Sequence, residues 1–515
     1  MRKFSIQDCA KILLFVVLFF ATIGTGFGQQ NTISRTETAT ITMPNIFGNN
    51  MVLQQNTQVP IWGWGKSGDK IEIIASWGKT KKTTVGIDGK WKAKIETPKA
   101  NAGQAPIYTL SVKGQVNSIS FDNILIGEVW VCAGQSNMEI SLKALEKRFD
   151  AVDYNNEMQA ANYPNIRLFN VKKDSAQIPQ VNCSGSWTSC STATVANFSA
   201  VAYYFGRQLY TNKNVNVPIG LIQDAFSGSA IQCWLKRDVL EADSVLKKKY
   251  VDPVVSSTTK KPYLFYNAMI APIIPFAIKG VIWYQGESNV GDNEIYTKAN
   301  LAMIKDWRKD WGTDFSFYAV QMTPRFYKDK QANDTKFGRG IFRDCQSAIM
   351  TIPKTGIIVT SDLMQNADER SDSHPRNKKD VGIRLALWAL AKDYEQKVQY
   401  LGPVYKSHQI IGDKIIISYK KESLVGGLTT KDSSYLRCFK IAGEDAKFYP
   451  AKAIIEGQTV VVSSPNVSKP VAVRYAYTDG AMTNLQNMEG LAAYPFRTDN
   501  INSAVAVDVS EEEVK

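Results

Sequence analysis

The stretch GEVWVCAGQSNMEI, residues 127–140, begins as an apolar run and ends abruptly in small polar residues. The apolar part is rich in β-branched and aromatic side chains, as buried β-strands are. The polar end places Ser136 between two amides, Gln135 and Asn137, directly after Gly134. In open α/β sheets, ligands bind beyond the carboxyl ends of the strands. The stretch therefore predicts a strand that presents a serine hydroxyl at the edge of a sheet.

Around this stretch, residues 123–398 alternate apolar strand-like runs with longer helix-like segments. The predicted strands are ILIGEVWVC, VPIGLI, GVIWYQ and GIIVTSD, and the predicted helices include FSAVAYYFGRQLY, YTKANLAMIKDWRKDW and DVGIRLALWALAKDYEQ. Asn197 and Asp380 are suitable residues to start the first and the last of these helices. This alternation predicts an α/β domain, a parallel sheet with helices on both faces.

Short strand-like runs broken by Gly, Pro, Asn and Asp flank this domain on both sides. Residues 29–122 are expected to form an N-terminal β-sandwich-like module, with a hairpin turn at Asp88-Gly89. Residues 399–515 are expected to form a C-terminal β-rich module. A chain of 515 residues agrees with such a division, because one core seldom organises so many residues.

Residues 1–28 have the features of a secretory leader. Basic residues precede a short apolar run, residues 12–23, which ends in small residues at Gly26 and Gly28. The run is shorter than the roughly 20 residues that span a bilayer. We therefore expect a signal peptide and a secreted protein without membrane insertion, in the periplasm rather than the medium. Export permits disulfides, and Cys183 with Cys190 is the most plausible pair.

The net charge of +13 is not concentrated in a basic cluster interleaved with aromatic residues. Nucleic acid is therefore not an expected partner. The sequence also lacks the H-E-x-x-H and C-x-x-C patterns of common metal sites, so neither a metal nor another cofactor is expected.

Several predicted strands end in residues that can react or stabilise charge. Ser136 needs a base to become a nucleophile, and the usual base is histidine. The chain has two histidines, His374 and His408, and only His374 has an aspartate, Asp372, two residues earlier. Asp372 would orient the imidazole, as in a serine triad. Asp362, at another strand end, is the alternative orienting acid, and a Ser–His dyad is a further one.

Two other classes of protein fit the residues less well. The G-x-S-x-G elbow of α/β-hydrolases is absent, because Met138 stands where the second glycine would be. A non-catalytic carbohydrate-binding protein would explain the abundant tryptophans and the flanking β-modules. Such a protein would not need a serine with its own base.

Three blocks in order, GQSNM (134–138), WYQGESN (283–289) and DSHPRNK (372–378), resemble the signature blocks of the sialate O-acetylesterase family. This family is a carbohydrate-esterase branch of the SGNH (GDSL-like) hydrolases, so the resemblance implies an SGNH-like catalytic domain. The similarity extends from about residue 40 to about residue 498.

The resemblance implies specific roles. Ser136 would be the nucleophile, His374 the base and Asp372 the orienting carboxylate. The oxyanion hole would consist of the Ser136 amide, Gly228 and Gln285. The family usually has two adjacent glycines here, whereas this chain has Ser227 before Gly228.

Residues expected to bind substrate or support the loops of the site are Asn137, Glu287, Arg343 and Gln346. The expected substrate is a small acetylated sugar or glycan. The O-acetyl group of 9-O-acetylsialic acid is the first choice, and acetylated xylan or another plant glycan is the alternative. The oligomeric state stays open.

Overall fold

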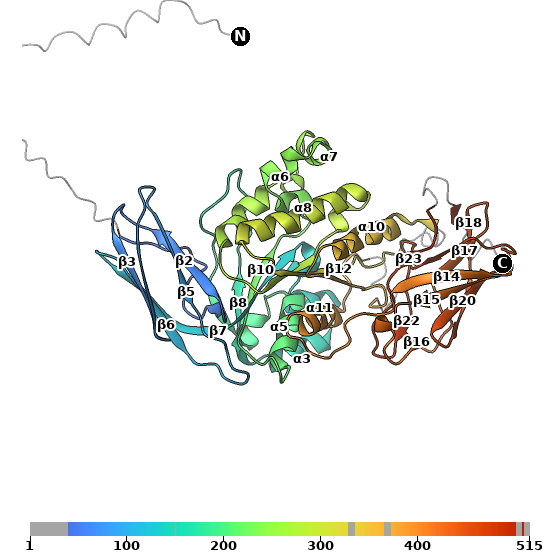
Figure 1. Cartoon of the computed structure of the whole chain (residues 1–515), viewed down its shortest axis with the longest axis horizontal. Coiled ribbons are helices and arrows are strands. Elements are labelled where there is room, and N and C mark those ends of the chain that lie inside the picture. Colours follow the sequence, from blue (N-terminus) through green and yellow to red (C-terminus); the bar gives the residue numbers. More distant parts are fainter. Residues whose placement is uncertain (1–39, 150, 328–334, 365–371, 501–506, 509–515) are drawn as a thin grey trace, which may run out of the picture. The chain divides into compact units, whose positions relative to one another are not determined.

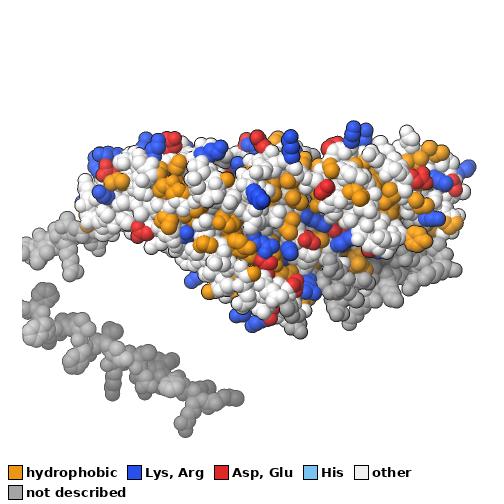
Figure 2. Space-filling view, turned by 90° about the horizontal axis from the view of Figure 1, so that it is seen from below, with side chains coloured by type: hydrophobic (Ala, Val, Ile, Leu, Met, Phe, Trp, Pro, Cys, Tyr) orange, Lys and Arg blue, Asp and Glu red, His pale blue; other side chains and the backbone are white. Residues whose placement is uncertain are grey.

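The computed structural model describes residues 40–149, 151–327, 335–364, 372–500 and 507–508 (Figure 1). The predicted leader lies outside these residues. Residues 40–515 belong to one compact unit. In the described part of the chain, no helix is both long and apolar enough to cross a bilayer. Basic and acidic side chains are mixed over the face drawn in Figure 2.

A parallel sheet with helices on both faces forms the centre of this unit, which confirms the expected α/β fold. In spatial order its parallel strands are β8 (Tyr163–Asn170), β10 (Ile219–Ala225), β7 (Ser118–Gly134), β11 (Gly280–Tyr284), β12 (Ser316–Val320) and β13 (Thr355–Ile358). The antiparallel strand β9 (Trp187–Cys190) follows β8 at the edge. The long covering helices are α5 (Ala200–Thr211), α8 (Glu294–Trp311) and α11 (Lys378–Lys392).

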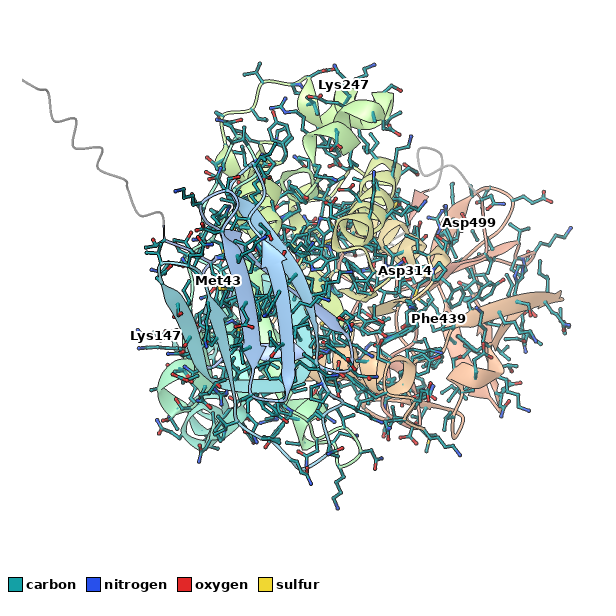
Figure 3. The ribbon with its side chains drawn as sticks, turned by 60° about the vertical axis from the view of Figure 1, so that its left-hand side comes forward. Met43, Lys147, Lys247, Asp314, Phe439 and Asp499 are labelled. Atoms are coloured by element: carbon teal, nitrogen blue, oxygen red, sulfur yellow. The ribbon has the colours of Figure 1, made fainter. Side chains whose placement is uncertain are left out.

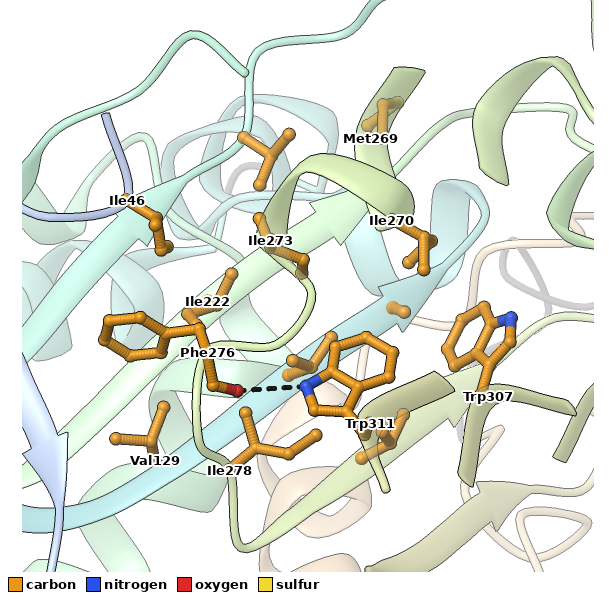
Figure 4. Packing of buried hydrophobic residues seen from close by; sticks show 14 of the residues in the cluster. Ile46, Val129, Ile222, Met269, Ile270, Ile273, Phe276, Ile278, Trp307 and Trp311 are labelled. Atoms are coloured by element: carbon orange, nitrogen blue, oxygen red, sulfur yellow. Dashed lines mark hydrogen bonds between the residues drawn. The ribbon is translucent and has the colours of Figure 1, made fainter. Parts of the chain in front are cut away.

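Alternate side chains of β7 enter two different cores, because successive residues of a strand point to opposite faces. Val129, Val131 and Ala133 pack in a core that includes tryptophans of α8. Trp130 and Cys132 pack in a second core with residues of α5 and α11. In Figure 1, α8 lies above the sheet and α5 and α11 lie below it. Figure 4 shows part of the first core, where the Trp311 indole donates to the Phe276 carbonyl at 2.9 Å.

The starts of two helices differ from the prediction. Ser199, not Asn197, caps α5, because its hydroxyl accepts from the Ala202 amide at 3.1 Å. Asn377 caps α11 by accepting from the amide of Asp380, the residue predicted to begin that helix. Sequence patterns place helix ends only to within a turn or so, and each cap fell within one turn of the predicted residue.

β7 is the topological switch point of the sheet, where the chain stops adding strands on one side and begins to add them on the other. β8 and β10 lie on one side of β7, and β11, β12 and β13 lie on the other. Gly134 at the end of β7 is in register with Ala225 of β10 and Tyr284 of β11, so three strands end together. A Cβ atom on Gly134 would lie 2.2 Å from the Tyr284 carbonyl oxygen, and its φ of +145° also favours glycine. Such a switch point is where ligands bind in open α/β sheets.

The N-terminal strands form two sheets, and one of them joins the central sheet through β7 (Figure 3). One sheet pairs β2 (Gln58–Trp64) with β5 (Lys90–Glu96), and the other contains β3 (Lys70–Ala75), β4 (Lys79–Thr84), β6 (Tyr108–Lys113) and the first part of β7. The short strand β1 (Val52–Gln54) pairs with the middle of β7. Thus β7 runs continuously across the expected module boundary at residues 122 and 123.

The turn at Asp88-Gly89 exists, but it does not close a hairpin. Gly89 has a φ of +74° and its amide donates to the Gly86 carbonyl. β4 before the turn pairs with β3, whereas β5 after it pairs with β2. The turn therefore carries the chain from one sheet to the other. Which strands pair is decided by packing and not by the turn residues.

The C-terminal residues form sheets around a core of their own, and all their strand pairs are antiparallel except β18 with β24. One sheet has the order β14 (Tyr405–Ile411), β15 (Lys414–Tyr419), β20 (Thr459–Ser463) and β19 (Lys452–Glu456). Another contains β23 (Phe496–Arg497), β21 (Ala472–Tyr475), β17 (Phe439–Ala442), β18 (Lys447–Pro450) and β24 (Val507–Asp508). The strands β16 (Leu428–Thr430) and β22 (Leu485–Asn487) pair with each other. Phe439, labelled in Figure 3, marks the start of β17.

Cys183 and Cys190 do not form the expected disulfide. Both cysteines are free thiols. Cys183 packs in the core beside α8 and Cys190 packs in the core beside α5, so the sheet separates the two thiols. Burial raises the pKa of each thiol to about 12, and both behave as small apolar side chains.

Candidate active site

Ser136, His374 and Asp372 meet at the carboxyl edge of the central sheet. Ser136 is the first residue of α1 (Ser136–Glu139), directly beyond the end of β7. The Nε2 atom of His374 lies 2.8 Å from the Ser136 hydroxyl oxygen. The Nδ1 atom of His374 lies 3.0 Å from Oδ1 of Asp372, which also accepts from the His374 amide at 2.9 Å. With Nδ1 protonated toward Asp372, Nε2 is free to accept the serine proton, as general-base catalysis requires.

Arg148 fixes Asp372 from the other side. This arginine lies near the end of α2 (Leu142–Phe149), and its Nε donates to Asp372 Oδ2 at 2.7 Å. Its Nη2 contacts the same oxygen. Burial raises the pKa of Asp372, but the hydrogen bonds from His374 and Arg148 outweigh that effect and lower it to about 2. Asp372 is therefore ionised wherever the histidine can act as a base.

The alternative orienting acid, Asp362, serves a different purpose. Both of its oxygens accept from Arg384 of α11 at 2.7 Å, and Lys431 approaches at 3.5 Å. The carboxylate is 6% exposed and does not line the cavity at Ser136. Asp362 thus forms a buried ion pair with Arg384 just beyond the end of β13. The carboxylate that contacts His374 is that of Asp372.

Ser136 and His374 open into a cavity of about 900 Å³. Basic residues predominate among its charged lining residues, which are Arg148, Lys172, Lys173, Arg325, Arg339, Glu139 and Glu287. Arg148 is paired with Asp372 and Lys173 with Glu139. The cavity therefore offers a reactive hydroxyl in surroundings that attract negative charge.

Two backbone amides at the cavity have no acceptor within the described part of the chain. They belong to Ser136 and Gly228, both of which line the cavity. Gly228 has a φ of +74°, a conformation that glycine adopts without strain. Unpaired amides beside a nucleophile are the donors that an oxyanion hole requires.

Ser227, the residue that departs from the family pattern, reinforces the turn before Gly228. Its amide and its hydroxyl both donate to Oε2 of Glu139, at 2.6 and 2.7 Å. Glu139 is the last residue of α1, the helix that begins with Ser136. Ser227 thus links the Gly228 turn to the helix that begins with Ser136, and a glycine at position 227 could supply only the amide bond of the two.

Gln285 does not donate into the cavity, contrary to the role implied by the resemblance. Its Nε2 donates to the Ser229 carbonyl at 3.1 Å and to Asn289 Oδ1 at 2.8 Å. Its Oε1 accepts from Tyr296, and the side chain is 1% exposed. Both amide hydrogens are therefore used to hold the loops beneath the site.

Asn137 and Glu287 support the loop that carries His374. Asn137 is fully buried, and its Nδ2 donates to Glu287 Oε1 at 2.6 Å and to the Ser373 carbonyl at 2.9 Å. Lys378, the first residue of α11, is buried as well. Its Nζ donates to Asn137 Oδ1 at 2.8 Å and to the Pro375 carbonyl at 2.6 Å. Sequence reasoning gave Lys378 no role, and its place in the DSHPRNK block was the only signal for it.

Arg343 and Gln346 do not line the cavity, and their contacts agree with loop support, one of the two roles expected for them, and not with substrate binding. Both lie in α10 (Gly338–Ser347) and are at least 97% buried. Arg343 donates to the carbonyls of Met322 and Ala476 at 3.0 Å. Gln346 donates to the Gln285 carbonyl and accepts from the Met322 amide.

The second histidine, His408, lies in β14 beside Tyr405, away from the cavity.

A serine, a histidine and an aspartate in this geometry at the switch point of a parallel sheet have the arrangement of nucleophile, base and orienting acid in a serine hydrolase. Comparison with known proteins gives the family. Residues 126–390, more than half of the chain, match the family model described as carbohydrate esterase, sialic acid-specific acetylesterase. The chain belongs to this family and is a carboxylic ester hydrolase, which sets aside the non-catalytic alternative.

Similar proteins are known from bacteria and mammals. A carbohydrate acetylesterase from Xanthomonas citri, of known crystal structure, is 32% identical and aligns with a TM-score of 0.79. That alignment covers 90% of this chain and all of the other. The sialate O-acetylesterase of Homo sapiens is 27% identical over 84% of this chain and 86% of its own length. The mouse sialate O-acetylesterase is also 27% identical, over 84% of this chain and 88% of its own.

Proposed function

We propose that the protein removes O-acetyl groups from sialic acids by a serine mechanism. The observation that carries the proposal is the 2.8 Å contact between His374 Nε2 and the Ser136 hydroxyl in an open cavity. The family description and the names of the mammalian relatives support the sugar. The basic lining of the cavity supports it too, because sialic acids carry a carboxylate.

The reaction proceeds in two steps on these residues. Ser136 attacks the acetyl carbonyl while its proton passes to His374, and the amides of Ser136 and Gly228 hold the oxyanion. The intermediate collapses when His374 returns the proton to the departing sugar hydroxyl, which leaves an acetyl-serine. Water then attacks this ester with His374 again as base, and acetate leaves. Asp372 keeps the imidazole oriented throughout.

The test of the mechanism is Ser136→Ala. This variant should lose at least about 10⁴-fold in kcat on p-nitrophenyl acetate, because loss of the nucleophile removes the covalent step. Its melting temperature should match that of the unchanged protein. Retained turnover would remove Ser136 from the role of nucleophile.

The test of the substrate is acetate release from 9-O-acetylsialic acid compared with acetylated xylan. The proposal expects a clear preference in kcat/KM for the sialic acid ester. A preference for xylan would favour the alternative, a plant-glycan acetylesterase, with the same serine chemistry. We further propose that the protein is exported and works in the periplasm, on the strength of the leader-like residues 1–28.

A further inference from the structure

No carboxylate of the described residues pairs with the guanidinium of two arginines of the cavity, Arg325 and Arg339. Arg339, in the first turn of α10, is 4% exposed, and within the described part of the chain its guanidinium makes one hydrogen bond, from Nη1 to the Thr323 carbonyl at 3.1 Å. A guanidinium has five N–H donors. Arg325 is exposed at the cavity, and no side chain of the described residues accepts from its guanidinium. Neither arginine forms an ion pair with a carboxylate among those residues, whereas Arg148 does.

A buried charge without a partner is costly, so a bound anion would stabilise the buried guanidinium of Arg339. Burial lowers the pKa of its guanidinium, and the nearby charges of Glu287 and Asp479 only partly oppose this. A planar carboxylate matches the donor geometry of arginine and forms paired hydrogen bonds with it. The cavity thus contains a preformed position for a carboxylate on the molecule that Ser136 attacks.

Asp479 of the C-terminal module holds both arginines by their backbones. It follows β21, and it is 4% exposed. Its Oδ1 accepts from the Arg339 amide at 2.6 Å, and its carbonyl accepts from the Arg325 amide at 2.9 Å. Its Oδ2 accepts from the Tyr327 hydroxyl at 2.8 Å. A carboxylate at the amino end of α10 also stabilises that helix.

The C-terminal module is packed tightly where it delivers Asp479. A Cβ atom on Gly340 of α10 would lie 1.7 Å from the Tyr477 carbonyl oxygen, so only glycine permits this approach. Arg343 ties the same helix to the carbonyls of Ala476 and Thr478. The position of Arg339 is therefore set by a module outside the central sheet.

We propose that Arg325 and Arg339 form a subsite for the carboxylate of an acetylated acidic sugar, and that Asp479 is the positioning residue of this subsite. The inference rests on the proposed function, since it assumes that the cavity binds a sugar ester. It adds the residues that select an acidic sugar over a neutral one, and it gives the C-terminal module a part in that selection.

The test compares inhibition of p-nitrophenyl acetate hydrolysis by N-acetylneuraminic acid and by its C1 carboxamide, which lacks the charge. The readout is the ratio of the two inhibition constants. In the unchanged protein the acid should bind about 10- to 100-fold more tightly, the usual value of charge-assisted hydrogen bonds. Arg325→Met and Arg339→Met should each bring the ratio close to one. Arg237→Met, an exposed arginine outside the cavity, is the matched control and should leave the ratio unchanged.

The positioning role of Asp479 is tested with Asp479→Asn, which keeps the shape and removes the charge. KM for 9-O-acetylsialic acid should rise about 10-fold, while kcat stays within about threefold. If this variant melts early, Tyr327→Phe, which removes one hydrogen bond to Asp479, gives the same comparison with a smaller effect. An unchanged KM in the folded variants would end the positioning role.

The outcomes separate this inference from the proposed function. A ratio near one in the unchanged protein, or a ratio that survives both arginine substitutions, would overturn the subsite even if 9-O-acetylsialic acid is a substrate. Conversely, the unchanged protein could release no acetate from 9-O-acetylsialic acid while the acid still inhibits and Arg325→Met abolishes that preference. The substrate proposal would then fail and the carboxylate subsite would stand.

Discussion

Asn137 and Ser373 are joined by a hydrogen bond of 2.9 Å, although 236 positions separate them in the chain. Asn137 follows the reactive serine, and Ser373 precedes the histidine. Lys378 extends this bond to Pro375 on the other side of His374, so both carbonyls that flank the histidine are held from the end of β7. The distance between serine and base is therefore set by buried hydrogen bonds, not by a flexible loop.

Lys378→Met tests this arrangement. The substitution keeps most of the side-chain volume but leaves Asn137 Oδ1 and the Pro375 carbonyl without their donor. We expect the free energy of unfolding to fall by about 1–3 kcal/mol, the cost of unpaired buried polar groups. We also expect kcat on p-nitrophenyl acetate to fall about 10- to 100-fold, because small displacements of a catalytic group are costly.

The neighbouring Lys379→Met serves as the control, because Lys379 lies in the same helix turn but is exposed. It should leave both quantities nearly unchanged. Equal effects of the two substitutions would show that the loss of Lys378 acts through general helix stability and not through the histidine loop.

Asp372→Asn tests the orienting carboxylate. The amide can take the place of the carboxylate but favours the wrong imidazole tautomer, so kcat should fall by about 10³- to 10⁴-fold with little change in KM. Steady-state kinetics on p-nitrophenyl acetate gives both parameters. A fall of less than about tenfold would indicate that serine and histidine suffice without Asp372.

Asp372 also makes stability depend on pH in a defined range. Its pKa is about 2 in the folded protein, against 3.8 for an unperturbed aspartate. A carboxylate whose pKa is lowered by folding stabilises the fold above its unfolded pKa and loses that contribution as the pH falls toward the folded one. The difference in unfolding free energy between the unchanged protein and Asp372→Asn should be constant from pH 7 to about pH 5 and shrink by pH 3. Urea unfolding at each pH measures it, and a difference that grows toward pH 3 would contradict the lowered pKa.

Asp362→Asn should damage the fold and spare the chemistry. Breaking its buried pair with Arg384 should cost about 3–5 kcal/mol in urea unfolding, because a charge stays buried without a partner. The kcat of the folded fraction at low temperature should stay within about threefold of normal. The double variant Asp362→Leu/Arg384→Met should recover much of the lost stability. A large fall in kcat without loss of stability would instead support Asp362 as the acid that orients the histidine.

The central fold could be predicted because its strongest signals are local. The buried strands β7, β10 and β11 are continuous apolar runs, and their polar ends mark the carboxyl edge of the sheet. The sequence does not predict β8 and β12, because YPNIRLFN contains a proline and charged or polar residues and SFYAV is short. Their burial is decided by neighbours in the sheet, which a single sequence does not display.

Those residues of the site that lie in recognisable sequence motifs could be predicted. Ser136, His374 and Asp372 stood at strand ends or in a distinctive block, and the structure brings them together. Arg343 and Gln285 could not be assigned correctly, because a polar residue on a helix or loop looks the same whether it faces substrate or backbone carbonyls. Arg339 and Asp479 were missed for a related reason, since their partnership depends on how two modules pack.

The continuity of β7 has a consequence for how this enzyme can be divided. The strand is 17 residues long, and it pairs with β6 near its start and with β10 and β11 near its end. Cutting at residue 123 would deprive the sheet that bears Ser136 of hydrogen-bonded support from β1 as well. The N-terminal strands are thus no detachable accessory, and a domain swap that preserves activity must place its junction upstream of residue 52.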